Sequence, residues 1–537
     1  VNRERWINDS LHSHELYNIG HLYEAAVAHY QATGKRTLLD VAVKSADLVC
    51  RDFGYDRLKV WPGHQGIEMG LVKLFRATGD RKYLDLAKFF LDIRGPGGRQ
   101  YNQALLKPVD QTEAEGHAVR AVYMYSGMAD IAAITKDDAY LGATGKVWED
   151  ITGKKIYITG GIGATGGNEG FAGPFFLPNA SAYCETCASI GDIFFNHRLF
   201  LLHGDGKYID ILEKTLYNSM LSGVSLSGDS FFYPNPLESS GQHQRSPWFG
   251  CACCPSNVAR FVPAIPGYVY AATDHEIYVN LYISGEAEIG SGNSSVRISQ
   301  RSGFPWNGKV ELTLNPVSHS RFAMKLRIPG WARNEAIPGG LYRFVHTSDK
   351  QYIIQLNGDT INPVVTKGYA VIDRKWNAGD RIAIDFPMPV RLVMADERIE
   401  DDAGKMAVQQ GPLIYCAEWP DNNKGNILNL LFRPDALFKT EFRQDLLGGA
   451  NIVTTSASPT VRNVDGGIDI PEEEPAVLIP YGLWANRGPG QMAVWLPVSV
   501  NAVKPLPAPS IAFKSIVRAS RMTGDLPAVN DQLVPRN

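Results

Sequence analysis

Hydrophobic residues in the first half of the chain recur at intervals of three and four, the spacing that places them on one face of an α-helix. The stripe from Leu16 to Tyr30 is the clearest example, and Gly34 follows it where the helix would end. Short turns such as Thr-Gly-Asp-Arg precede a new helix. The pattern predicts helices over residues 16–30, 38–50, 67–77, 83–93, 112–134, 138–151, 185–202 and 208–218.

Helices joined by short turns favour helical hairpins that pack side by side. We therefore predict that residues 1–270 form an (α/α)6 toroid whose inner helices surround a cavity. A full ring of this kind needs more helices than the pattern supplies. The chain also begins with Val1 and not with methionine, so we expect the first helices of the domain to be missing from it.

After Tyr270 the period changes to two, which indicates β-strands. Alternating segments such as 276–283, 309–314 and 322–328 predict an antiparallel β-sandwich over residues 271–395. A charged break follows, and sparser strands with long loops predict a second sandwich over residues 396–537. The expected fold class is thus a multidomain α and β protein: a helical catalytic domain and two β-sandwich domains.

Composition narrows the class of protein without identifying it. A chain of 537 residues is too long for one ordinary domain. Its formal net charge of −3 gives no reason to expect nucleic acid or an anionic membrane as partner. No apolar run is long enough to span a bilayer, so we expect a soluble protein.

Five of the seven cysteines fall in two short stretches: Cys184 and Cys187 in the first, and Cys251, Cys253 and Cys254 in the second. A disulfide framework would spread pairs along the chain instead. Cysteine and carboxylate together are ligands that zinc accepts, and Glu185 lies within the first stretch. Pro255 suits the first turn of a helix, whose unpaired N–H groups would favour thiolates beside it.

The clustered residues predict a zinc site with Glu185, Cys187, Cys253 and Cys254 as ligands and Cys184 and Cys251 as alternatives. A cluster of reduced thiols in a core or a disulfide would explain the same cysteines without a metal. Four filled positions are typical of structural zinc. Zinc can also hold a cysteine as a thiolate that attacks carbon. Cys50 and Cys416 stand apart, and we expect them to be small buried hydrophobic residues.

Several motifs occur in an order that resembles glycoside hydrolase family 127, the β-L-arabinofuranosidase family. The resemblance is close over the helical half and coarser over the strands. The segments that carry it are His14–Tyr17, Pro62–His64, Gln111–His117, Ile156–Gly163, Asn168–Phe171, Glu185–Cys187 and Cys251–Pro255.

The resemblance implies a retaining exo-glycosidase that releases β-L-arabinofuranose from plant glycans. Cys253 would be both the nucleophile and a ligand of Zn²⁺, and Glu169 would be the general acid/base. The expected substrate-binding residues, which would line the sugar pocket, are His14, His64 and His117.

Each role has an ordinary structural alternative. Glu169 lies in a glycine-rich loop, where a glutamate is usually a solvated surface residue. His14 and His21 follow one helical stripe, so either could pack between helices. Glu113 and Glu115 fit a supporting position or a buried ion pair equally well.

Other functions share these features. The same chemistry could act on another pectic sugar, an acidic one if a basic residue faced it. A toroid lyase or epimerase with structural zinc would place a Tyr/His pair at the cavity centre, remote from Cys253. A binding protein without catalysis would have no carboxylate within reach of Cys253. The expected partner is an oligosaccharide or glycan, a homodimer is the candidate assembly, and the compartment is the periplasm by analogy or else the cytoplasm.

Overall fold

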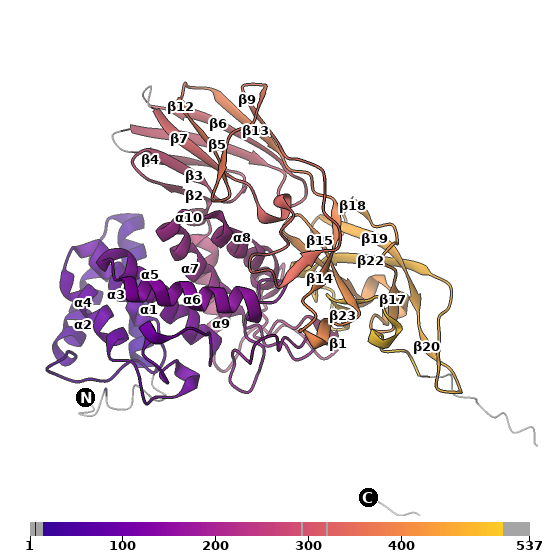
Figure 1. The fold of residues 1–537 in the computed structure, drawn as a ribbon. Helices are drawn as coiled ribbons and strands as arrows, with labels where there is room; N and C mark the ends of the chain where they lie inside the picture. The colour runs from indigo at the N-terminus through magenta and orange to yellow at the C-terminus, as the bar shows by residue number, and fades with distance from the viewer. Residues whose placement is uncertain (1–5, 7–13, 292–293, 318–320, 508–537) are drawn as a thin grey trace, which may run out of the picture.

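The structure is a computed structural model that describes residue 6 and residues 14–291, 294–317 and 321–507. Helices make up its first half and strands its second, as Figure 1 shows from indigo to yellow. The predicted order of a helical domain followed by two β-rich regions is therefore confirmed. Among the described residues, no helix is both long enough and apolar enough to cross a bilayer.

The helical half is built from antiparallel hairpins. Within the described residues these are α1 (Glu15–Thr33) with α2 (Thr37–Asp52), α3 (Ile67–Thr78) with α4 (Arg81–Asp92), α5 (Ala118–Thr135) with α6 (Asp138–Asp150), and α7 (Thr186–His203) with α8 (Gly206–Thr215). The helices α9 (Cys253–Phe261) and α10 (Pro266–Val269) follow.

The first helices of successive hairpins pack against one another, in the order α1, α3, α5, α7 and then α9. Every residue of α5 from Ala118 to Ala132 is buried, because this helix has neighbours on all sides. By contrast α2 buries a single stripe of its surface, as an outer helix does. This layering is that of an α/α toroid, and closure into six hairpins stays a prediction.

Two predicted helices begin later than the periodicity indicated. Residues 112–117 are not helical, because Gly116 has a φ of +70° and a Cβ there would lie 2.1 Å from the carbonyl oxygen of Gln100. The helix α5 therefore starts at Ala118, and His117 is its N-cap. Glu185 is likewise the extended N-cap of α7 and not its first helical residue. Both corrections concern residues predicted to belong to the site.

Residues 270–386 form two facing sheets around one core, as the sequence predicted, although β3 and β7 pair in parallel. One sheet has the order β10-β9-β13-β6-β5-β4 and the other β11-β12-β7-β3-β2. Their bounds are β2 (Tyr270–Ala272), β3 (Glu276–Val279), β4 (Gly285–Ser291), β5 (Ser294–Ser302), β6 (Lys309–Pro316), β7 (Arg321–Arg327), β9 (Ile353–Leu356), β10 (Asp359–Ile361), β11 (Val365–Thr366), β12 (Tyr369–Lys375) and β13 (Asp380–Asp385).

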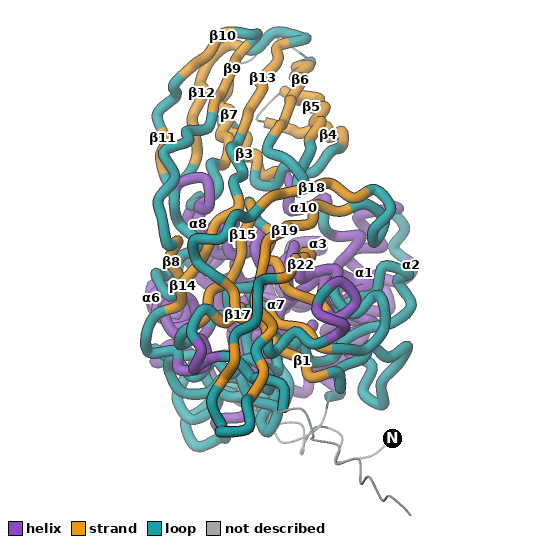
Figure 2. Tube along the Cα trace, turned by 90° about the vertical axis from the view of Figure 1, so that its right-hand side faces the viewer, coloured by secondary structure: helices purple, strands orange, loops and turns teal. Residues whose placement is uncertain are grey.

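The C-terminal strands join one eleven-stranded sheet, whereas the sequence predicted a second two-sheet sandwich. Figure 2 shows it in front of the helices, below the middle region. It branches where β15 and β16 pair with extra strands. Its members are β14 (Val390–Ala395), β15 (Lys405–Gln410), β16 (Leu413–Glu418), β17 (Leu430–Phe432), β18 (Lys439–Arg443), β19 (Ala450–Pro459), β22 (Glu474–Pro480), β23 (Gln491–Ala493), β24 (Leu496–Pro497) and two strands from earlier regions. A separate hairpin pairs β20 (Val461–Arg462) with β21 (Ile468–Asp469).

Three strands of this sheet lie before the predicted boundaries at residues 270 and 395. From the helical half, β1 (Glu238–Ser240) pairs with β23. From the predicted middle region, β8 (Tyr342–Phe344) pairs with β14, and β14 pairs with β15. Short strands paired over such distances leave no periodic signal in the sequence. The described regions are therefore interlocked rather than joined by simple linkers.

A buried ion cluster ties the middle region to the helices. Arg327 at the end of β7 is fully buried and donates to Asp210 Oδ1 of α8 at 2.6 Å, to Glu213 of the same helix, and to the carbonyl oxygen of Asn280 at 2.6 Å. Glu213 is buried and has this guanidinium as its ion-pair partner, whereas Asp210 also pairs with Arg333 at 3.2 Å.

Replacing Arg327 with methionine should lower the free energy of unfolding by about 3–5 kcal/mol, since it leaves a buried carboxylate without its partner. Urea titration followed by tryptophan fluorescence measures this loss. Arg321→Met is the matched control, because Arg321 and its partner Asp373 are both exposed and the pair is worth little. Equal stability of the two variants would contradict the anchoring role.

Candidate active site and metal centre

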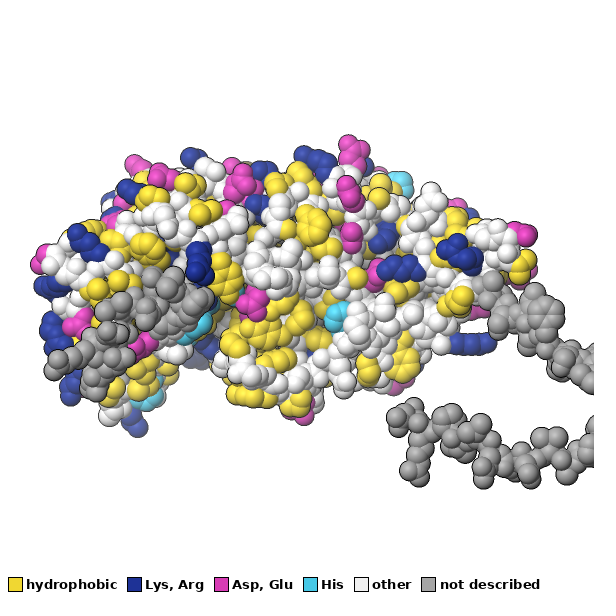
Figure 3. All heavy atoms as spheres, turned by 90° about the horizontal axis from the view of Figure 1, so that it is seen from below, with side chains coloured by type: hydrophobic (Ala, Val, Ile, Leu, Met, Phe, Trp, Pro, Cys, Tyr) yellow, Lys and Arg dark blue, Asp and Glu magenta, His cyan; other side chains and the backbone are white. Residues whose placement is uncertain are grey.

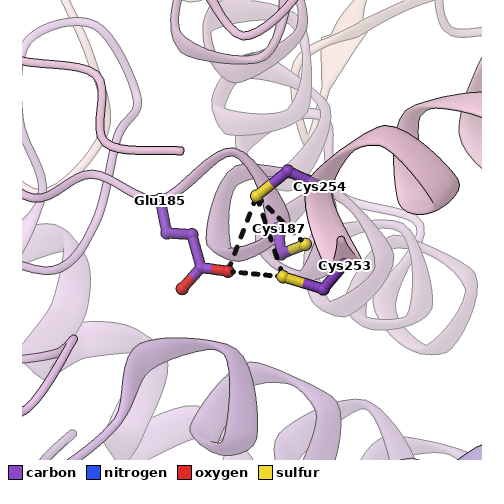
Figure 4. A group of neighbouring side chains, drawn as sticks. All are labelled: Glu185, Cys187, Cys253 and Cys254. Atoms are coloured by element: carbon purple, nitrogen blue, oxygen red, sulfur yellow. Dashed lines mark hydrogen bonds between the residues drawn. The ribbon is translucent and has the colours of Figure 1, made fainter. Parts of the chain in front are cut away.

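The two cysteine-bearing stretches meet at the amino ends of two helices. Glu185 and Cys187 lie at the start of α7, and Cys253 and Cys254 begin α9. One carboxylate oxygen and three sulfurs from these residues all lie within 4.8 Å of one another. Figure 4 shows the four side chains pointing toward a common centre. The extended conformation of the N-cap turns Glu185 toward the sulfur of Cys187, which a regular helix would not do at this spacing.

The separations fit a tetrahedral zinc site. Zinc bonds of about 2.3 Å to sulfur and about 2.0 Å to oxygen place two sulfurs about 3.8 Å apart and a sulfur and an oxygen about 3.5 Å apart. The Sγ atom of Cys254 lies 3.6 Å from Sγ of Cys187 and 3.9 Å from Sγ of Cys253. Glu185 Oε1 lies 3.4 Å from Sγ of Cys253 and 3.8 Å from Sγ of Cys254.

The chemistry of the cluster also calls for a cation. Burial raises the pKa values of Glu185, Cys187 and Cys254 well above their usual ranges. The second carboxylate oxygen of Glu185 is buried without a hydrogen-bond partner among the described residues. A divalent cation would supply the charge that lets these acids ionise together. The residues present therefore fit zinc.

Cys253 differs from Cys187 and Cys254 because it is only partly buried and because its pKa is lowered, whereas theirs are raised. Hydrogen bonds from Cys187 and Cys254, followed by those of Tyr233 and Glu185, lower the pKa of Cys253 to about 2. The Tyr233 hydroxyl lies 3.1 Å from its sulfur. These hydrogen bonds favour the thiolate form of Cys253, and its partial exposure leaves the sulfur open to a reactant.

The remaining cysteines lie outside this four-atom group. Cys184 is fully buried and Cys251 is exposed, and neither supplies an atom to the group. Cys416 is fully buried in the C-terminal sheet, as expected for a small hydrophobic residue. Cys50 is only partly buried, so the expectation of full burial is wrong there.

Glu169 is held by two donors and is not a freely solvated loop residue. The Tyr183 hydroxyl donates to Oε1 at 2.8 Å, and Nε2 of His117 lies 3.2 Å from Oε2. These hydrogen bonds, that of His117 first, lower the pKa of Glu169, while negative charge on Cys253 raises it. Its side chain keeps 35% of its surface exposed, so a substrate can reach it.

Close backbone contact explains how the loop holds Glu169 in place. A Cβ on Gly170 would lie 1.8 Å from the carbonyl oxygen of Gly116, so only glycine permits this approach. The carbonyl of Glu169 accepts from the N–H of Ala118 at 3.1 Å. Glu169 itself has a φ of +50°, a strained conformation that is typical of functional loops. The loop is therefore pinned to the start of α5.

The three predicted pocket histidines lie together. The ring centroid of His64 is 5.6 Å from that of His14 and 5.8 Å from that of His117, and the Tyr17 ring lies tilted against His64 with centroids 4.0 Å apart. Burial lowers the pKa values of His64 and His117, so both are neutral near pH 7.

Hydrogen bonds assign the protons on two of these rings. Nδ1 of His64 lies 2.7 Å from the carbonyl oxygen of Gln65 and donates to it, which leaves Nε2 as an acceptor. Nδ1 of His117 accepts from the N–H of Arg120 at 3.5 Å, which leaves Nε2–H to face Glu169. The pocket therefore offers one ring acceptor and one donor already committed to the carboxylate.

Other sequence candidates have structural roles. His21 lies 2.9 Å from Nη1 of Arg260, and burial lowers its pKa to about 4, so it is a satisfied histidine between helices. Glu113 is exposed beside Lys155, and Glu115 accepts from Gln100 at 2.7 Å.

Sequence reasoning missed the two tyrosines that touch the reactive groups. Tyr183 stands two residues before Glu185 of the Glu-x-Cys motif, but nothing in its spacing indicates that it reaches Glu169. Tyr233 lies far from Cys253 in the chain and is brought to it because its carbonyl accepts from the N–H of Thr186 at 3.1 Å. Only the tertiary contacts assign these residues to the site.

Comparison with known proteins covers most of the chain. Residues 1–267 match the model of the β-L-arabinofuranosidase GH127 catalytic domain, and residues 276–388 match that of the GH127 middle domain. Residues 390–497 match the C-terminal domain of glycoside hydrolase family 127. The chain belongs to glycoside hydrolase family 127. The family 127 models and the structure thus agree on a helical region followed by two β-rich regions.

Characterised members of family 127 are similar along most of their length. A non-reducing end β-L-arabinofuranosidase of Bifidobacterium longum subsp. longum is 35% identical, over 90% of this chain and 78% of that protein. A solved family 127 β-arabinofuranosidase is 52% identical with a TM-score of 0.91, over 94% of this chain and 80% of the other. The family 127 β-L-arabinofuranosidase Ara127N-Se of Geobacillus stearothermophilus T6 is 38% identical with a TM-score of 0.86, over 92% and 82%.

Proposed function

We propose that this chain is a retaining β-L-arabinofuranosidase that releases β-L-arabinofuranose from the non-reducing end of a glycan. The observation that carries the proposal is the pairing of an ionised, accessible sulfur, that of Cys253, with the carboxylate of Glu169 held by His117 and Tyr183. A retaining glycosidase needs such a nucleophile and acid on opposite sides of the scissile bond. Bound zinc would keep the Cys253 sulfur as a thiolate and improve it as a leaving group.

In the first half of the reaction, the Cys253 sulfur attacks the anomeric carbon. A carbon–sulfur bond forms as the carbon–oxygen bond to the leaving group breaks. Glu169 delivers its proton to the departing oxygen.

In the second half, Glu169 acts as a base. It takes a proton from water, and the water oxygen forms a bond to the anomeric carbon as the carbon–sulfur bond breaks. Hydrogen bonds from His117 and Tyr183 keep the carboxylate ionised and oriented for this step. Two inversions at one carbon return the sugar with its original configuration.

The histidines supply the pocket for the sugar that is released. We assign His14, His64 and His117 to its hydroxyl groups because their rings are neighbours and lie beside Glu169. The free Nε2 of His64 is suited to accept from one hydroxyl. Neutral rings favour an uncharged sugar.

The competing functions receive less support. An acidic pectic sugar would need a free cation in the pocket, whereas Arg120 donates to the carbonyl of Gly63 and Arg260 pairs with Glu24. A lyase or epimerase was expected to hold Cys253 remote from a Tyr/His pair at the cavity centre, yet Cys253 lines the same pocket as Tyr17 and His21. A binding protein without catalysis would not need Glu169 within electrostatic reach of Cys253.

Removal of the metal tests the proposal. The purified protein should hold a single zinc and hydrolyse 4-nitrophenyl β-L-arabinofuranoside. Chelation should reduce that rate by about 10²-fold or more. Mutation of residues that only hydrogen-bond to the ligands of a catalytic metal already lowers activity by about 10–100-fold. Added zinc should restore it.

The controls are the α-L-arabinofuranoside and the β-D-xylopyranoside of the same aryl group, which should not be cleaved. Full activity of a demonstrably zinc-free protein would refute the metal-held nucleophile. Preferential cleavage of another sugar would assign the second pectic substrate instead.

A further inference from the structure

The segment that leads into the nucleophile presents two aromatic side chains at the edge of the site. Trp248 keeps 65% of its surface exposed, and Phe249 is partly exposed. Aromatic side chains are common in the lining of ligand sites, and Trp248 directly precedes Phe249, whose ring packs on Tyr233. No step of the proposed hydrolysis uses either ring.

The segment is firmly anchored on both sides of its chain. Arg245 is buried, donates twice to the carbonyl of Ser222 at 3.2 and 2.9 Å, and packs over the ring of Phe232. Ser246 and Phe231 exchange two backbone hydrogen bonds of 2.9 Å. The Ser246 hydroxyl donates to the carbonyl of Trp248 at 2.8 Å. The two rings are therefore presented by a preorganised loop, which reduces the entropy cost of binding to them.

Aromatic contacts connect this loop to both reactive groups. Phe249 packs edge-on against Tyr233 with ring centroids 5.4 Å apart, and the Tyr233 hydroxyl lies 3.1 Å from the Cys253 sulfur. On its other side Tyr233 lies 6.2 Å from Tyr183, whose hydroxyl binds Glu169. The row of rings thus extends from the proposed acid/base outward to the surface.

The acid/base defines the side on which the leaving group departs. Glu169 must protonate the leaving oxygen, so the rest of the leaving group lies beyond Glu169, away from the histidines. Tyr183 donates to Glu169 itself, so the row of rings that continues through Tyr233 to Phe249 begins at the acid/base. Figure 3, which views the molecule from below, shows hydrophobic side chains gathered near the middle of that face, with acidic and histidine side chains among them.

We infer that Phe249 and Trp248 form a leaving-group subsite that packs against the face of the next sugar in the glycan. The C–H groups on one face of a sugar ring carry slight positive charge and complement the negative face of an aromatic ring. A neutral sugar fits, because neither ring offers a charged partner. The inference rests on the proposed function and adds a specificity for disaccharide or longer substrates over simple alkyl glycosides.

The test compares two substrates in three proteins. Trp248→Ala and Phe249→Leu should each lower kcat/KM for a β-L-arabinofuranosyl disaccharide by about 5- to 10-fold, a typical contribution of one aromatic contact. The rate on methyl β-L-arabinofuranoside, which has no second sugar, should stay within about 2-fold of the unmodified protein. Leucine keeps most of the packing of Phe249 on Tyr233 and removes only the aromatic face.

Phe442→Ala is the matched control, because Phe442 is exposed in the C-terminal sheet and lies outside the proposed site. An equal loss on both substrates would show that the rings act through Tyr233 and the nucleophile, and would overturn the subsite. No loss on either substrate would overturn it as well. Failure of the unmodified protein to cleave either substrate would instead overturn the proposed function, and the subsite with it.

Discussion

Replacing Cys253 with serine should abolish hydrolysis of β-L-arabinofuranosides, with a fall in kcat of about 10⁴-fold or more. The hydroxyl of serine is far less acidic than a thiol and is a poor ligand for zinc, so the variant loses both the ionised nucleophile and one metal contact. Cleavage of 4-nitrophenyl β-L-arabinofuranoside measures the loss. Metal content and unfolding midpoint should be recorded beside it.

The control is Cys251→Ser, two residues away. Cys251 is exposed and supplies no atom to the four-ligand group, so activity should change less than about 3-fold. A thiol-specific alkylator should inactivate the unmodified protein and the Cys251 variant alike. Retention of activity by the Cys253 variant with its zinc intact would rule out sulfur as the nucleophile.

Replacing Glu169 with glutamine should lower kcat by about 10²–10⁴-fold for substrates with poor leaving groups, the usual contribution of general acid/base catalysis. The amide cannot donate a proton to the leaving oxygen or remove one from water. With a 2,4-dinitrophenyl leaving group the first step needs no acid, so the second step becomes limiting. Azide, which needs no base, should then raise the rate and yield the β-glycosyl azide.

The pH profile gives a second measurement for the same residue. A general acid is active while protonated, so kcat/KM of the unmodified protein should fall as pH rises through the pKa of Glu169. The glutamine variant should lack this alkaline limb. Glu113→Gln is the control, because Glu113 is exposed beside Lys155 and should leave rate and profile unchanged. An unaltered profile in the Glu169 variant would assign the acid to another group.

Hydrophobic periodicity predicted some elements of this fold and missed others. Apolar residues at intervals of three and four predicted most of the helices of the described hairpins. A helix buries its apolar face against any neighbour, so this signal does not depend on which helix it packs against. The start of α5 was predicted six residues too early, since the positive φ of Gly116 is imposed by the backbone at Gln100. The eleven-stranded sheet was missed because β1 and β8 are paired by distant partners.

The sequence by itself predicted the four residues of the candidate metal cluster and the carboxylate in the glycine-rich loop, because their residue types and order are distinctive. Only the tertiary structure decided how they work together. The Tyr183 hydroxyl on Glu169 and the Tyr233 hydroxyl on Cys253 arise where loops from different helices meet. Such contacts depend on the packing of the whole helical region, which fixes directions and distances that no local pattern of hydrophobic and polar residues encodes.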